Sequence, residues 1–101
     1  MGEVRHVGDG DSICVGRTSN IATWIEIRLA DFDAPELHHC GGEQAKRALA
    51  RLALSRPVTC IAERGRSGRV IVYDRVLARC RLQGSSLGDL MRQAGVREGG
   101  R

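Results

Sequence analysis

Residues 25–36, Ile-Glu-Ile-Arg-Leu-Ala-Asp-Phe-Asp-Ala-Pro-Glu, decide the predicted fold. The first five residues alternate apolar with charged side chains: Ile25, Ile27 and Leu29 against Glu26 and Arg28. This period of two is typical of a strand with one buried face. Pro35 ends the strand, because its ring excludes an ordinary helix and a central strand and biases the residue before it toward an extended backbone. We therefore predict a strand followed by a stiff turn that carries several carboxylates.

The composition allows one domain with a modest core, since the chain has 101 residues and is 42% hydrophobic. The net charge of +4 comes from 16 Lys and Arg against 12 Asp and Glu, and the only lysine is Lys46. Arginine presents paired donors that match phosphate oxygens, so the excess favours a polyanionic partner. Arginine enrichment in a GC-rich genome is the alternative. With 3% aromatic residues, base stacking cannot dominate nucleic-acid binding.

The cysteines and the apolar runs bear on metal binding and location. The four cysteines lie far apart without a Cys-x-x-Cys pair, which argues against structural zinc. Cys60 and Cys80 fall on two strands that we expect to pair; we interpret them as buried thiols, and a disulfide, which would indicate export, is the alternative. No apolar run approaches the roughly 20 residues that cross a bilayer, and no apolar signal segment opens the chain. The sequence therefore does not assign the protein to a cellular compartment.

Turn and period signals divide the chain into short elements. We predict two strands within Val4–Val15, a strand over Ile21–Ala30, a helix over Glu43–Leu54, a strand over Val58–Glu63, a strand over Val70–Leu82 and a helix from the Ser86 cap to Gly95. The order β-β-β-α-β-β-α predicts a mainly β fold with two helices, a five-stranded Greek-key barrel of the OB-fold type. One domain spans residues 1–101, with its core over about 4–95 and a disordered tail over 96–101.

Two short motifs carry polar side chains that could bind a metal. Gly8-Asp9-Gly10 is a turn or bulge signal that places Asp11 where one strand bends into the next, and a plain hairpin turn with solvated aspartates is the alternative. His38, His39 and Cys40 are adjacent, but neighbouring residues of an extended segment point in opposite directions. We therefore do not expect a metal site at this second motif.

Five motifs occur in a fixed order along the chain: Asp9-Gly-Asp11-Ser-Ile, Ile27-Arg28-Leu with Asp33-Ala-Pro-Glu36, Gly42-Glu-Gln-Ala45, Tyr73-Asp-Arg75 and Met91-Arg-Gln-Ala-Gly95. Together they resemble the staphylococcal nuclease-like (thermonuclease) family, over Val4 to Gly95. The resemblance implies an OB-type barrel that cleaves phosphodiester bonds of DNA and RNA with calcium (Ca2+). The chain departs from the family's type member in lacking the tyrosines and third helix that follow the second helix there.

The resemblance also assigns the metal ligands and the base. It implies that Asp11 and Asp33 ligate calcium through their carboxylates, and that the backbone carbonyl of Ala34 supplies another oxygen. Glu36 would be the general base that activates the attacking water. Calcium accepts several oxygen ligands in a loose geometry, so two carboxylates, a carbonyl and waters suffice.

By the same resemblance, Arg28 and Arg75 would clamp the scissile phosphate, and Tyr73 and Arg69 would bind the substrate. Two arginines on different strands can donate paired hydrogen bonds to the non-bridging oxygens, where negative charge grows during attack. The alternative for each arginine is a local salt bridge: Arg28 to Glu26 or Asp31, and Arg75 to Asp74.

The sequence therefore predicts a monomeric, calcium-dependent nuclease acting on single-stranded DNA or RNA, without a membrane segment. A catalytically weak barrel that binds nucleic acid or a protein is the second hypothesis, since aromatic residues are scarce. A third is that the chain is one fragment of a larger protein. The sequence does not distinguish DNA from RNA, or endonucleolytic from exonucleolytic cleavage.

Overall fold

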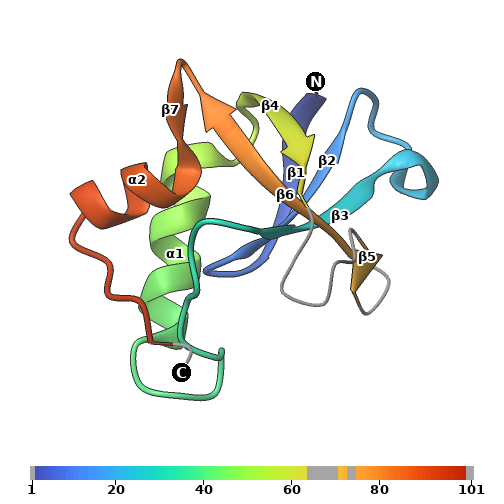
Figure 1. Cartoon of the computed structure of the whole chain (residues 1–101). Coiled ribbons are helices and arrows are strands. Elements are labelled where there is room, and N and C mark those ends of the chain that lie inside the picture. The colour runs from blue at the N-terminus through green and yellow to red at the C-terminus, as the bar shows by residue number, and fades with distance from the viewer. Residues whose placement is uncertain (1, 64–70, 73–74, 100–101) are drawn as a thin grey trace.

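A computed structural model describes residues 2–63, 71–72 and 75–99. Figure 1 shows a small β-barrel with two helices on one side of it. The elements are β1 (Gly2–Asp9), β2 (Ser12–Gly16), the short 3-10 helix η1 (Ile21–Thr23), β3 (Ile25–Leu29), α1 (Gly42–Ala53), β4 (Pro57–Ala62), β5 (Ile71–Val72), β6 (Arg75–Leu82), β7 (Ser85–Ser86) and α2 (Leu87–Gln93). Within the described residues, no helix is both long and apolar enough to cross a membrane.

Five strands close the barrel. β1 pairs antiparallel with β2 and with β4, β2 pairs with β3, and β4 pairs with β6. The parallel pairing of β3 with β6 completes the ring. Each of these strands therefore has two neighbours, which removes exposed strand edges, and the arrangement is consistent with an OB-like barrel.

The apolar patterns of the sequence place the helices against the barrel. Ala45, Leu49 and Ala53 of α1 are fully buried, as the predicted stripe requires. The Ser86 hydroxyl accepts a hydrogen bond from the Asp89 amide at 3.1 Å, so the predicted cap of α2 is confirmed. The core also holds Phe32, from the loop after β3, at 2% exposure.

The predicted strand over Ile21–Ala30 is wrong in its first part. Residues Ile21–Thr23 form the helix η1, and the strand begins only at Ile25. The Asn20 side chain accepts a hydrogen bond from the Ala22 amide at 3.1 Å. This local side-chain bond satisfies a backbone donor that the sheet ladder would otherwise take, so the turn persists into the apolar residues.

The predicted strand over Val70–Leu82 is also wrong, because it is two strands. Val72 of β5 pairs antiparallel with Arg75 of β6, so the chain reverses between them. After β6, Gln83 and Gly84 both have positive φ angles, of 52° and 86°, and the chain returns as β7. Two positive φ angles in a row are the geometry of a tight hairpin turn.

The sequence predicts a disordered tail from residue 96, and the structure describes residues 96–99 of it. Val96 packs against the core, and its amide donates to the Met91 carbonyl at 3.1 Å. Gly95 has a φ angle of 83°, which turns the chain back after α2. The Gly99 amide then donates to the Asp33 carbonyl at 3.1 Å.

The interpretation of Cys60 and Cys80 as buried thiols is wrong as well. They are directly opposite each other on β4 and β6, and they form a disulfide. Facing residues of adjacent antiparallel strands bring their Cβ atoms close enough for this bond. Cys14 and Cys40 are free.

We predict that the chain, purified without reductant and unfolded in guanidinium, shows 2 titratable thiols, from Cys14 and Cys40. Prior reduction should raise the count to 4, the full number of cysteines. Titration with a chromogenic disulfide reagent measures both values. A full count without reductant would contradict the cross-strand bond.

Candidate functional site

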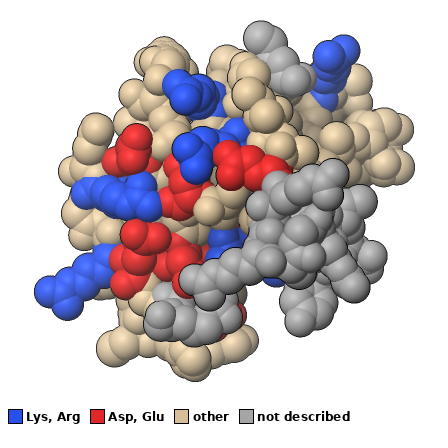
Figure 2. Space-filling model, viewed as in Figure 1, with Lys and Arg blue, Asp and Glu red and all other residues tan. Residues whose placement is uncertain are grey.

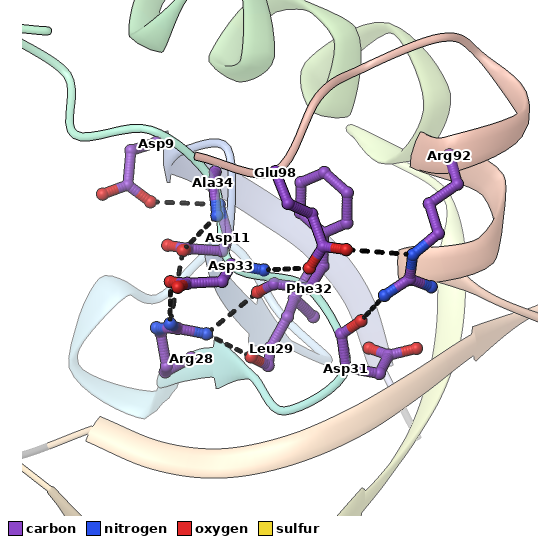
Figure 3. Close-up of polar contacts among 10 residues, drawn as sticks. All are labelled: Asp9, Asp11, Arg28, Leu29, Asp31, Phe32, Asp33, Ala34, Arg92 and Glu98. Carbon is purple, nitrogen blue, oxygen red and sulfur yellow. Dashed lines mark hydrogen bonds and ion pairs between the residues drawn. The ribbon is translucent and has the colours of Figure 1, made fainter. Parts of the chain in front are cut away.

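Arg28 joins two carboxylates that come from different parts of the chain (Figure 3). Its Nη2 lies 2.7 Å from Oδ1 of Asp33 and 3.5 Å from Oδ2 of Asp11. Asp11 sits in the turn between β1 and β2, and Asp33 in the loop after β3. The structure therefore brings together three of the residues that the sequence analysis assigned to the site.

Arg28 also fixes the path of the chain after β3. Its Nη1 donates to the Phe32 carbonyl at 3.0 Å and, in a shorter contact, to the Leu29 carbonyl. The alternative salt bridges to Glu26 or Asp31 are not the ones it forms. One guanidinium group thus holds the start and the end of the turn together, and pairs with a carboxylate at each side.

Asp11 is buried, with 6% of its surface exposed. Its Oδ2 accepts a hydrogen bond from the Ala34 amide at 2.8 Å, and its own amide donates to Oδ1 of Asp9 at 3.1 Å. Burial raises the pKa of Asp11 to about 7, with a further upward contribution from Asp9, against the opposing effects of the Ala34 amide and Arg28. The free protein therefore holds a carboxyl group that titrates near neutrality.

Gly10 permits this contact between the turn and the loop. A Cβ atom at position 10 would lie 2.6 Å from the Cβ of Ala34 and 2.6 Å from that of Ala45. No side chain fits at those distances, so any larger residue would push the β1–β2 turn away from Ala34. The glycine of the Asp9-Gly-Asp11 motif therefore brings Asp11 within reach of the Ala34 amide.

Glu36 lies on the same loop but does not take part in the cluster. Its side chain is exposed, and within the described ranges its carboxylate forms no hydrogen bond or ion pair. Its carbonyl accepts from the His39 amide at 2.9 Å. A Cβ atom at Gly42 would lie 2.1 Å from the Glu36 carbonyl oxygen, so the glycine lets α1 begin directly against this loop.

Arg75 is placed by the strand register. Arg28 of β3 faces Leu77 of β6, two residues after Arg75. Because side chains alternate along a strand, Arg28, Leu77 and Arg75 all project from the outer face of the barrel. Ala78 and Cys80 occupy the alternate positions of β6 and are buried, as expected for side chains that point into the barrel. Tyr73 and Arg69, the predicted substrate-binding residues, lie outside the described residues.

A second group of side chains, which the sequence analysis did not assign, surrounds the loop from the other side (Figure 3). Glu98 accepts a hydrogen bond from the Asp33 amide at 3.0 Å and pairs with Arg92 at 3.2 Å. The Asp33 amide is the main cause of a lowered pKa for Glu98. Arg92 lies over the Phe32 ring, 5.6 Å from its centroid, and donates to the Asp31 carbonyl. No local periodicity signals this contact, because residues 33 and 98 are 65 positions apart.

The charges of this face are mixed in sign. Figure 2 shows acidic and basic side chains interleaved on the face seen in Figure 1. Among the described residues, Arg92 pairs with Asp89 at 3.0 Å and Arg28 with Asp33 at 2.7 Å, so part of the positive charge is neutralised locally. The net charge of +4 is thus not gathered here as a uniform basic patch.

The part of the chain that the structure describes contains no group of three or more His, Cys, Asp or Glu side chains arranged to hold a metal ion. The predicted calcium ligands differ from such a group, because they are two carboxylates and one backbone carbonyl. Asp11 and Asp33 both point at Arg28. A metal ion at this position would therefore have to share the two carboxylates with the guanidinium group or displace it.

Comparison with known proteins identifies no relative. No protein-family model matches the chain, and no curated protein matches its sequence.

We predict that Asp11 makes the protein less stable as pH rises. The pKa of its carboxyl is about 7 in the folded chain against an ordinary value of 3.8, so the folded state binds more protons between these values. The stability that the protonated group contributes is present below 3.8 and is lost as pH rises toward 7. Urea unfolding with chelator at pH 5 and at pH 8 measures the change.

The Asp11→Asn variant keeps an oxygen for the Ala34 amide and removes the charge. Its stability relative to the wild type should therefore increase between pH 5 and pH 8. The exposed Asp89→Asn variant serves as the control and should follow the wild-type profile. Parallel profiles for Asp11→Asn and wild type would show that the Asp11 carboxyl titrates at its ordinary pH.

Proposed function

We propose that the chain is a calcium-dependent nuclease that hydrolyses phosphodiester bonds of DNA or RNA, a staphylococcal nuclease-like domain on a Greek-key barrel of the OB type. The observation that carries this proposal is the cluster of Arg28, Asp33 and Asp11. These residues belong to two separate motifs of the family, and each carboxylate lies within 3.5 Å of the Arg28 guanidinium group.

The donor set is compatible with calcium in kind. Calcium prefers carboxylate and carbonyl oxygens together with waters, in a flexible geometry. Asp11 and Asp33 supply two carboxylates, and the loop places Ala34 next to both. Asp11 is also a buried carboxyl whose pKa is raised, so a cation beside it would stabilise its ionised form. Asp11, Asp33 and the Ala34 carbonyl would hold the ion, which would supply Lewis-acid polarisation of a phosphate oxygen.

Glu36 is proposed as the general base. Its carboxylate is exposed, so water can reach it, and it lies three residues after Asp33 on the same loop. A positioned carboxylate can accept the proton of a water that attacks phosphorus, a contribution of about 100-fold or more to the rate. Pro35, between Ala34 and Glu36, is buried and limits the freedom of this part of the loop.

Arg28 and Arg75 are proposed to bind the phosphate. Both project from the outer face of adjacent strands, so they can approach one phosphate from two sides. Arg28 would have to exchange at least one of its present acceptors for a phosphate oxygen, because both of its terminal nitrogens donate within the protein. Hydrogen bonds to the non-bridging oxygens would become stronger as negative charge develops on them.

That engagement of Arg28 also favours a second candidate function, a barrel that binds nucleic acid or a protein without cleaving it. If Arg28 remains paired with Asp33 and Asp11, only Arg75 of the two proposed arginines is left to bind the phosphate. Binding by charge alone would weaken with salt and would not depend specifically on calcium. The dependence of binding on calcium therefore separates the two functions.

We predict that the purified chain cleaves a fluorescent single-stranded DNA with calcium and not with chelator. Glu36→Gln should lower the rate about 100-fold or more, because it removes the proton acceptor and keeps the side-chain shape. Arg75→Ala should lower it by a factor of the same order. Gel analysis of the products over time measures all three rates.

Glu43→Gln is the matched control, since Glu43 is an exposed glutamate at the start of α1, and its rate should equal that of the wild type. Unchanged calcium-dependent cleavage in Glu36→Gln would exclude Glu36 as the base. A folded wild-type chain that binds the DNA without cleaving it, with or without calcium, would favour the binding module.

A further inference from the structure

The backbone on either side of Asp33 is held by four hydrogen bonds, one for each polar group of its two peptide units. In the peptide unit before it, the Phe32 carbonyl accepts from Arg28 at 3.0 Å and the Asp33 amide donates to Glu98 at 3.0 Å. In the unit after it, the Asp33 carbonyl accepts from the Gly99 amide at 3.1 Å and the Ala34 amide donates to Asp11 at 2.8 Å. Both peptide planes are therefore fixed at each end.

Two of these four bonds come from the C-terminal segment, residues 96–99. This segment reaches the loop because Gly95 adopts a left-handed conformation after α2, and the Val96 amide bonds the Met91 carbonyl at 3.1 Å. This is the six-to-one hydrogen bond of a helix that ends at a glycine. Val96 then packs against the core, which directs Glu98 and Gly99 across Asp33.

Arg92 anchors the segment to α2 and to the loop. Its Nε pairs with Oε2 of Glu98 at 3.2 Å, so the two oxygens of Glu98 serve Arg92 and the Asp33 amide at the same time. Its Nη2 donates to the Asp31 carbonyl, and its guanidinium lies over the Phe32 ring. An exposed ion pair alone contributes little. Here the pair orients a carboxylate for a charge-assisted bond to a backbone amide.

We propose that Glu98 is a positioning residue of the candidate site: through the Asp33 amide it holds the backbone that aims the Asp33 carboxylate. The Asp33 side chain leaves the backbone between these two peptide planes, so the direction of its carboxylate depends on the bonds that hold them. The catalytic consequence rests on the proposed function. The effect on the Asp33 backbone does not.

Three variants test the proposal. Glu98→Ala removes the acceptor for the Asp33 amide. Glu98→Gln keeps an amide oxygen in its place and serves as the conservative rescue. Asp89→Ala is the matched control, because Asp89 is the other carboxylate that pairs with Arg92, at 3.0 Å, and it has no recorded bond to the loop. Both positions are exposed, so the three variants are expected to fold.

The first measurement is hydrogen exchange at the Asp33 amide by NMR, without metal. The wild type should protect this amide, and Glu98→Ala should speed its exchange about tenfold or more, as expected for loss of a bond to a charged acceptor. Glu98→Gln should restore most of the protection, and Asp89→Ala should match the wild type. An unprotected amide in the wild type, or equal protection in Glu98→Ala, would overturn the proposal.

The second measurement is calorimetric titration with calcium alone. Glu98→Ala should bind calcium about 10-fold more weakly than the wild type, as is usual when a group that orients a ligand is removed, and Glu98→Gln should recover most of the affinity. If the wild type binds no calcium and cleaves no DNA, the proposed function fails, and the exchange result still decides the role of Glu98. Equal calcium affinity in wild type and Glu98→Ala would overturn the link between Glu98 and the site.

Discussion

The bridge that Arg28 makes between Asp33 and Asp11 is the interaction on which the rest of the site depends. Both carboxylates approach one guanidinium group, and this positive charge favours the ionised form of the buried Asp11 against the effect of burial, which raises its pKa to about 7. The same guanidinium holds the Phe32 carbonyl. The Arg28 side chain therefore joins the β1–β2 turn to the loop after β3. The hydrogen bond between Asp11 and the Ala34 amide connects the same two segments.

The parts of the fold that the sequence predicted correctly are those set by short windows of residues. The alternation before Leu29, the apolar stripe of α1 and the Ser86 cap each depend on neighbours within a few positions. The errors at Ile21–Thr23 and within Val70–Leu82 arose where a local turn interrupts an apolar run, because periodicity cannot distinguish one long strand from a strand and a turn. The disulfide depended on register, which only the folded sheet fixes.

The residues of the candidate site likewise fall into those that short motifs indicated and those that only long-range contacts bring to the site. The motifs pointed to Asp11, Arg28 and Asp33, and the structure groups them. Glu98 could not be found in this way, because its contact with Asp33 spans 65 positions and its neighbours are polar residues and glycines, a composition typical of disorder. The segment contacts the rest of the chain through hydrogen bonds to a backbone and through the packing of Val96, and neither contact leaves a pattern in the surrounding sequence.

On the proposed function, Arg28 would have to leave at least one of its present acceptors to bind a phosphate. In the free protein its donors are held by two carbonyls and by the carboxylates of Asp33 and Asp11, which attract its positive charge. On the proposed function, a cation bound to the two carboxylates would neutralise part of their charge. The electrostatic attraction between them and Arg28 would then be weaker. Its donors then become available to a phosphate on the outer face. Metal and phosphate would therefore be bound cooperatively, with Glu98 and Gly99 keeping the Asp33 backbone in place while Arg28 changes partners.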